Sequence, residues 1–239
     1  VVSALLLTGL SRRGAAAATP QRPLEDLREG LRFVRANRWT ALWFATIAFS
    51  TLAFHGPFDV LVPTMLKVDL ALGEARAGWW IAAIFAGGGA GALLVSAVVA
   101  QRDLPRRFMT VLYAAEAVTL FGLAAFASIG ALWQAPLIGF VVFGATVLSQ
   151  IIIETTLQRE VPRALLGRVI GLEWFVAIGL APVSFAIAGP LGRLFGARPV
   201  LLVAGLGGGA VVAAVMFVRG ARTPEHAPGT RQPAAVASG

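Results

Sequence analysis

Two rows of polar residues stand out because each lies inside a long apolar stretch of the sequence. Both rows repeat every four residues, with Thr51, His55 and Asp59 in the first and Thr146, Gln150, Glu154 and Gln158 in the second. A four-residue spacing places the members of a row on one face of a helix. Polar groups at membrane depth are costly and normally face a cavity or a polar partner. The two rows therefore predict the walls of a pathway for a small-molecule substrate or for protons.

Each row also has a simpler interpretation, which the sequence leaves open. His55 and Asp59 lie toward the outer end of their predicted helix, where they could reach the membrane surface instead of a cavity. Glu154 lies near the predicted inner mouth, where a carboxylate could attract a cationic substrate or accept a proton. Its alternative role is an ion pair that holds an inner gate closed, with Arg159, Arg163 or Arg168 as the partner.

Two further carboxyl groups lie within apolar stretches. Glu116 is about 12 Å into the helix predicted to begin at Phe108, which makes it the most deeply placed carboxyl group. An apolar surrounding favours the protonated form of a carboxyl group, and this would suit a proton carrier. The alternative is a protonated glutamate that is hydrogen-bonded to Tyr113 or to a neighbouring helix. Glu173 is expected to pair with a loop arginine and to help close the inner face.

The composition requires that most of the surface faces lipid. Of 239 residues, 57% are hydrophobic and 13% are charged, whereas soluble domains have about 25% charged residues. The net charge of +8 comes from short arginine clusters between apolar runs, so no nucleic-acid partner is expected. The chain has no cysteine and two histidines, and it shows no nucleotide-binding or nucleophile motif. We therefore predict no enzyme activity, no metal site and no cofactor.

Six apolar runs are long enough to cross a lipid bilayer as helices. They cover residues 40–66, 77–100, 108–128, 131–156, 168–190 and 199–218. The sequence thus predicts an all-α polytopic membrane bundle, with a six-helix half-domain over residues 39–218. The apolar stretch 1–10, followed by Arg12 and Arg13, is interpreted as the end of a truncated transmembrane helix.

The distribution of basic residues predicts the orientation of these helices. Sixteen of the 20 lysine and arginine residues lie in segments 11–38, 101–107 and 157–168 and in the tail from 219. These segments are predicted to be cytoplasmic by the positive-inside rule, so the chain is a multi-pass cell-membrane protein with a cytoplasmic C-terminus. The basic loop 11–38 is predicted to include a short amphipathic helix, at 23–39. This helix either lies on the membrane surface or serves as a solvated linker. The tail 219–239 is predicted to be disordered.

The segment 157–198 resembles one family closely. Its prolines and glycines fall where the exporter branch of the major facilitator superfamily has them: Pro162, Gly167-Arg168, Pro182 and Gly189-Pro190. That branch includes enterobactin exporters and macrolide-efflux-type proteins, and the chain resembles its second half, from the end of helix six through helix twelve. The resemblance implies a missing N-terminal six-helix half as partner, substrate held near the midplane, alternating access and proton antiport. It places the two polar rows on helices seven and ten and places Glu116 on helix nine, at the outside of the bundle.

One loop departs from that family. The pattern G-x-x-x-D-R-x-G-R-R, usual between helices eight and nine, is replaced by 95–108, which keeps only Arg102, Arg106 and Arg107 of it. With Arg159 and Arg168, these arginines are candidates for ion pairs at an inner gate. Two other functions remain open, namely the membrane domain of an ATP-driven transporter and a non-transporting scaffold or subunit. The inner loops are short for the first of these, because such domains extend their helices to meet the ATPase.

Overall fold

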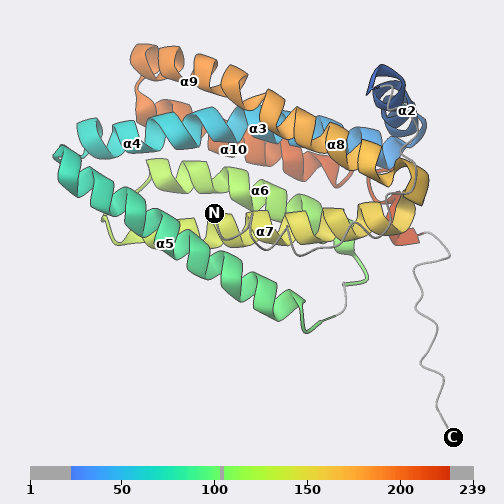
Figure 1. The fold of residues 1–239 in the computed structure, drawn as a ribbon. Helices are drawn as coiled ribbons and strands as arrows, with labels where there is room; N and C mark the ends of the chain where they lie inside the picture. Colours follow the sequence, from blue (N-terminus) through green and yellow to red (C-terminus); the bar gives the residue numbers. More distant parts are fainter. Residues whose placement is uncertain (1–22, 103–104, 227–239) are drawn as a thin grey trace, which may run out of the picture.

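The computed structural model describes residues 23–102 and 105–226, which form a bundle of helices (Figure 1). No strand occurs within these two ranges. The labelled elements are α2 (Pro23–Ala36), α3 (Arg38–Gly56), α4 (Val62–Thr64), α5 (Glu74–Val99), α6 (Phe108–Ala127), α7 (Gln134–Glu160), α8 (Arg163–Gly179), α9 (Ala181–Phe195) and α10 (Ala197–Val215). The predicted all-α fold is confirmed for the described chain, and the expected helix stub at 1–10 lies outside it.

Six helical segments of the described chain are long and apolar enough to cross a membrane. They are Arg38–Asp69, Glu74–Val99, Phe108–Ala127, Gln134–Glu160, Arg163–Phe195 and Ala197–Val215. Their number and order confirm the prediction from the apolar runs. The fourth and fifth spans end at Glu160 and Phe195, beyond the predicted limits 156 and 190. In the fourth span, helical hydrogen bonding continues past the last apolar residue until Pro162 interrupts it.

Prolines interrupt the regular helix in the first and fifth spans. A π-helical turn covers Pro57–Leu61, and a second one covers Met65–Asp69 after the short α4. The fifth span is broken at Leu180, two residues before Pro182. Proline has no backbone N–H to donate, so the helical hydrogen-bond pattern fails there, as the sequence predicts.

A serine of α9 is inserted into the backbone of α3 at the first of these interruptions. The Gly56 N–H donates to Ser184 Oγ at 2.7 Å, and Ser184 Oγ donates to the Leu52 carbonyl oxygen at 2.7 Å. In a regular helix the Gly56 N–H would bond to Leu52 directly. A Cβ atom at Gly56 would overlap with the Ser184 carbonyl oxygen. The glycine therefore allows the backbones of α3 and α9 to touch.

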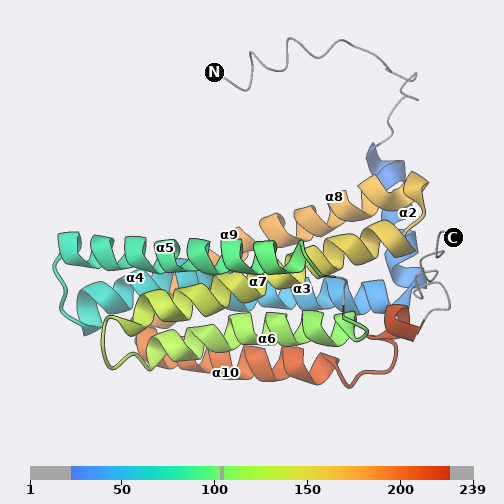
Figure 2. The same ribbon diagram turned by 90° about the horizontal axis from the view of Figure 1, so that it is seen from below.

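Helix α6 lies between α7 and α10 in both ribbon views (Figures 1 and 2). In its most apolar window 67% of the residues are buried, compared with 11% in the Arg163–Phe195 span. The family resemblance places this helix at the outside, but within the described chain it is the most buried of the six. The reason is that α7 and α10 cover two of its faces.

Helices α5 and α7 pack in close backbone contact, and Figure 1 shows that they cross obliquely. Three glycines form this contact, because a Cβ atom at Gly87, Gly91 or Gly139 would meet a backbone carbonyl oxygen of the other helix. Small residues let membrane helices approach closely and gain van der Waals contact without a hydrophobic driving force. The glycines at these three positions therefore serve helix packing.

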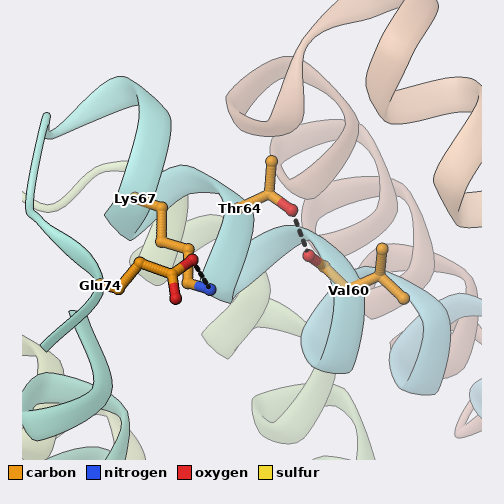
Figure 3. Close-up of polar contacts among 4 residues, drawn as sticks. All are labelled: Val60, Thr64, Lys67 and Glu74. Atoms are coloured by element: carbon orange, nitrogen blue, oxygen red, sulfur yellow. Dashed lines mark hydrogen bonds and ion pairs between the residues drawn. The ribbon is translucent and has the colours of Figure 1, made fainter.

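The turn between the first span and α5 is held by short-range polar contacts (Figure 3). Thr64 Oγ1 donates to the Val60 carbonyl oxygen at 2.6 Å, and Lys67 Nζ lies 3.1 Å from Glu74 Oε1. Arg198, at the start of α10, lies 3.9 Å from Asp69. These contacts fix the end of the bundle that carries few basic residues.

The opposite end carries α2, residues 100–102 and 105–107, the turn 161–162 and the segment 219–226, and we call it the basic end. The helix expected at 23–39 is present as α2, and it packs against α8 through Gly30, which contacts the backbone of Arg168. Glu29 forms an ion pair with Arg168. The position of α2 on a membrane surface stays a prediction.

The first part of the predicted disordered tail is ordered, so that prediction is wrong for residues 219–226. Residues Thr223–His226 form a 3₁₀ turn, and Ala221 is fully buried. Glu225 Oε1 accepts a hydrogen bond of 2.7 Å from the Thr110 N–H, in the first turn of α6. The N–H groups of a first turn have no partner within their own helix, so Glu225 stabilises α6 from outside. Residues 227–239 lie outside the described chain.

Removing this contact should destabilise the bundle modestly. We expect Glu225→Ala to lower the free energy of unfolding by about 1 kcal/mol, since one N-terminal amide and the helix dipole lose their acceptor. Glu225→Gln keeps an acceptor oxygen and should lose less than half of that. Thermal unfolding of the purified full chain measures both variants. Equal midpoints for wild type and Glu225→Ala would show that the contact contributes nothing.

Candidate functional site

Two apolar clusters fill the bundle, one toward each end, and a polar layer separates them. The cluster toward the basic end contains Trp43 and Tyr113, and the other contains Phe58 and Phe126. Between them, α3, α6 and α7 contribute side chains that are hydroxylic or ionisable. We call this layer the polar band, and it consists of Ser50, Thr51, Glu116, Thr119, Thr146 and Ser149.

Hydrogen bonds within the polar band link α6 to α7. Glu116 is 6% exposed, and its Oε1 accepts a hydrogen bond of 2.6 Å from Ser149 Oγ. Thr119 Oγ1 and Thr146 Oγ1 are 3.2 Å apart. The Ser50 hydroxyl lies in the same wall and makes no hydrogen bond of ordinary geometry within the described chain.

The contact between Glu116 and Ser149 suits both protonation states of the carboxyl group. Ser149 Oγ also lies 2.9 Å from the Thr146 carbonyl oxygen. A hydroxyl has one proton to donate and two lone pairs that accept. When Glu116 is ionised, Ser149 donates to it. When Glu116 is protonated, it donates to Ser149, whose own proton turns to the Thr146 carbonyl. The geometry therefore accommodates proton uptake and release without a change of side-chain position.

A cavity of about 350 Å³ opens onto the polar band. Its walls come from α3, α6, α7 and α8 and include His55, Phe143, Gln150 and Trp174. A second pocket of about 260 Å³ shares Ile47, Gln150, Trp174 and Ala177 with the first, so the two are adjacent. The second pocket is lined by Glu154, Gln158 and Glu173. We call these two adjacent pockets the polar path, which runs along α7.

Most residues of the two predicted rows lie on this path. The first cavity is lined by Thr51, His55, Thr146 and Gln150, together with Glu116, and the second pocket by Gln150, Glu154 and Gln158. The bundle therefore brings the two rows together, although they lie on different helices about 90 residues apart in sequence. His55 Nδ1 is buried there without a hydrogen bond to any described residue.

Asp59 is the predicted residue that lies apart from the path. Its side chain is exposed, and it lines neither pocket. The four-residue spacing assumes a regular α-helix, but Asp59 belongs to the π-helical turn Pro57–Leu61. An i→i+5 turn rotates less per residue, so Asp59 falls out of line with Thr51 and His55.

Three residues of the polar band were missed in the sequence. They are Ser50, Thr119 and Ser149, all of them buried. Thr119 lies three residues after Glu116, and Ser149 lies three residues after Thr146. A spacing of three residues also keeps side chains on one helix face. This spacing was the signal that could have found two of the three.

The prediction that Glu173 pairs with a loop arginine is wrong within the described chain. Its Oε1 accepts a hydrogen bond of 2.7 Å from Trp43 Nε1, and both side chains are buried. An indole N–H buried in an apolar cluster needs an acceptor, and Glu173 is the one that α8 brings to it. The loop arginine Arg168 is paired with Glu29. The tether therefore joins α3 to α8.

Glu154 forms no ion pair with a described arginine, although such a pair was its alternative role. Its side chain is exposed and faces the second pocket. The other candidate gate residues, Arg102, Arg106, Arg107 and Arg159, are likewise exposed and have no ion pair with a carboxylate of the described chain. Among the predicted gate residues, an ion pair is seen at Arg168.

The polar path has space for a small molecule, and three carboxyl groups line it. Glu116 lines the first cavity. Glu154 and Glu173 line the second pocket, which continues toward the basic end. Aromatic walls beside hydroxyl and amide groups are typical of sites that bind a small organic ligand. Comparison of the chain with protein-family models, with curated proteins and with solved structures gave no match.

Proposed function

We propose that this chain is the substrate-carrying bundle of a secondary active transporter, which exports a small molecule such as a drug or siderophore in exchange for protons. The observation that supports this most is the polar band with its cavity, midway between two apolar clusters of a membrane bundle. Placing six polar side chains at membrane depth, five of them buried, is costly. A bundle with a purely structural role would fill this layer with apolar side chains instead.

Proton coupling is proposed on the basis of Glu116. It is a buried carboxyl group that faces the cavity, and Ser149 can serve as its donor or as its acceptor. The adjacent pocket with Glu154 and Glu173 would give protons a route between Glu116 and the basic end. By the positive-inside rule, the basic end is then the cytoplasmic one.

The resemblance to the major facilitator superfamily adds a partner to this proposal. A second six-helix half would cover the open side of the polar path, and the two halves would alternate between inward-open and outward-open arrangements. The exposed aromatic residues Trp174 and Phe175 on α8 suit such an interface. This part depends on analogy with the fold family.

Single cysteines test whether the cavity holds water. The chain has no cysteine, so Thr51→Cys, Thr146→Cys and Gln150→Cys are clean reporters. We expect them, in the full chain in membranes, to react with a membrane-impermeant methanethiosulfonate at least about tenfold faster than Leu93→Cys, because only a hydrated thiol ionises readily. Leu93 is the control, since it is apolar and exposed on α5. Cavity cysteines as inert as Leu93→Cys would contradict the proposal.

Substrate protection then tests transport. A panel of macrolides, catecholate siderophores and lipophilic cations is screened for compounds that slow the labelling of Gln150→Cys. We expect at least one of them to do so, and to move across vesicles that carry the protein when a proton gradient is imposed. A hydrated cavity that no compound protects, or protection without gradient-driven movement, would contradict export while leaving a binding function.

A further inference from the structure

A third pocket, of about 340 Å³, lies between the C-terminal end of α5 and the last turns of α7. The α5 side contributes Ser96, Val99, Ala100 and Arg102, and the α7 side contributes Ile151, Thr155 and Arg159. None of these residues lines the two pockets of the polar path. The site is therefore separate from the proposed transport pathway.

Among the described residues, the lining of the pocket has two guanidinium groups and no carboxylate. Arg102 and Arg159 come from two different helices, and neither forms an ion pair with a carboxylate of the described chain. Glu160, the neighbour of Arg159 in sequence, does not line the pocket. Two guanidinium groups that share one pocket repel each other unless an anion lies between them. The carbonyl groups at the end of α5 carry only a partial negative charge, which two full positive charges exceed.

The remaining walls favour a ligand that is anionic at one end and apolar at the other. Val99, Ala100 and Ile151 form an apolar wall below the two arginines. On α5, the face that carries Ser96 and Ala100 continues to Leu93, which is exposed. Figure 1 shows the C-terminal end of α5 lying apart from the other helices.

We propose that this pocket binds a phosphate group, and that the phosphate belongs to the headgroup of an anionic phospholipid. Guanidinium groups donate two parallel hydrogen bonds to phosphate oxygens, and Ser96 adds a hydroxyl donor. The acyl chains lie along Leu93. A lipid bound in this way ties the splayed end of α5 to α7 at the basic end of the bundle.

Lipid titration tests this site in the purified full chain. The probe is fluorescent phosphatidylglycerol added to the protein in detergent. We expect Arg102→Gln and Arg159→Gln each to weaken its binding about fivefold and the double variant about 25-fold, the effect of one basic residue near an anionic lipid being of this size. Arg193→Gln is the matched control, since Arg193 is exposed at the opposite end of the bundle, and we expect it to bind as wild type does.

Competition identifies the source of the phosphate. Displacement of the probe by unlabelled phosphatidylglycerol, and not by phosphatidylcholine or millimolar inorganic phosphate, supports the lipid. Displacement by inorganic phosphate supports the phosphate site but assigns it to a free anion. Arg102→Lys and Arg159→Lys keep the charge and guard against misfolding, and they should bind better than the glutamine variants. Wild-type binding by the folded double variant, or equal weakening by Arg193→Gln, would overturn the proposal.

Discussion

Replacing Glu116 by glutamine is expected to lower proton-driven transport about 100-fold per folded molecule, because a positioned proton carrier contributes at least that much to rates that depend on proton transfer. Glutamine keeps the size of the side chain, and its amide oxygen still accepts the hydrogen bond from Ser149. The bundle should therefore fold normally. Only the ability to take up and release a proton is lost.

The measurement compares movement with and without a pH gradient, using the compound that protects the cavity cysteines. A proton carrier predicts that Glu116→Gln loses gradient-driven movement and retains exchange at equal pH. Glu74→Gln is the control, since Glu74 is an exposed carboxylate at the first residue of α5, and the change should leave both rates unchanged. If Glu116→Gln keeps the wild-type rate and gradient dependence, Glu116 is a structural acceptor for Ser149.

The second large effect is expected in the contact between α5 and α7. Alanine at Gly87 or Gly91 would place a Cβ atom against the carbonyl oxygen of Pro136 or Phe140, and backbone atoms cannot move aside as a flexible side chain can. Overpacking of this kind costs about 1–3 kcal/mol per site. We expect the double variant Gly87→Ala/Gly91→Ala to lower the unfolding midpoint by about 10 °C, given about 2–4 °C per kcal/mol at this size.

Gly89 provides the matched control on the same helix. No atom lies within 4 Å of a Cβ atom built at Gly89, and the residue is exposed. Gly89→Ala should therefore leave the midpoint unchanged or raise it slightly, since alanine is the better helix former. The thermal unfolding of all variants is followed in the same detergent. A double variant that unfolds together with Gly89→Ala would show that α5 and α7 do not need this close approach.

The sequence by itself determined the fold class and the number of spans. A helix that crosses lipid satisfies its own backbone hydrogen bonds, so an apolar run of about 20 residues is enough to predict it. The same local logic found most of the candidate site. Helix geometry alone places Thr51 and His55 on one face of α3, and Gln150 and Glu154 on one face of α7. A polar face at membrane depth normally meets a cavity or a polar partner.

The tertiary structure alone decided which side chains meet. Glu173 accepts from Trp43, 130 residues away in sequence, and Thr110 donates to Glu225, 115 residues away. Arg102 and Arg159 share a pocket because the C-terminal end of α5 and the last turns of α7 lie at the same end of the bundle. Asp59 does not lie in line with the other residues of its predicted row, because it belongs to a local π-helical turn. The spacing of residues within one helix fixes the direction of a side chain relative to that helix only. The partner that the side chain meets depends on how two helices pack, and the packing is decided by side-chain shapes along both helix surfaces.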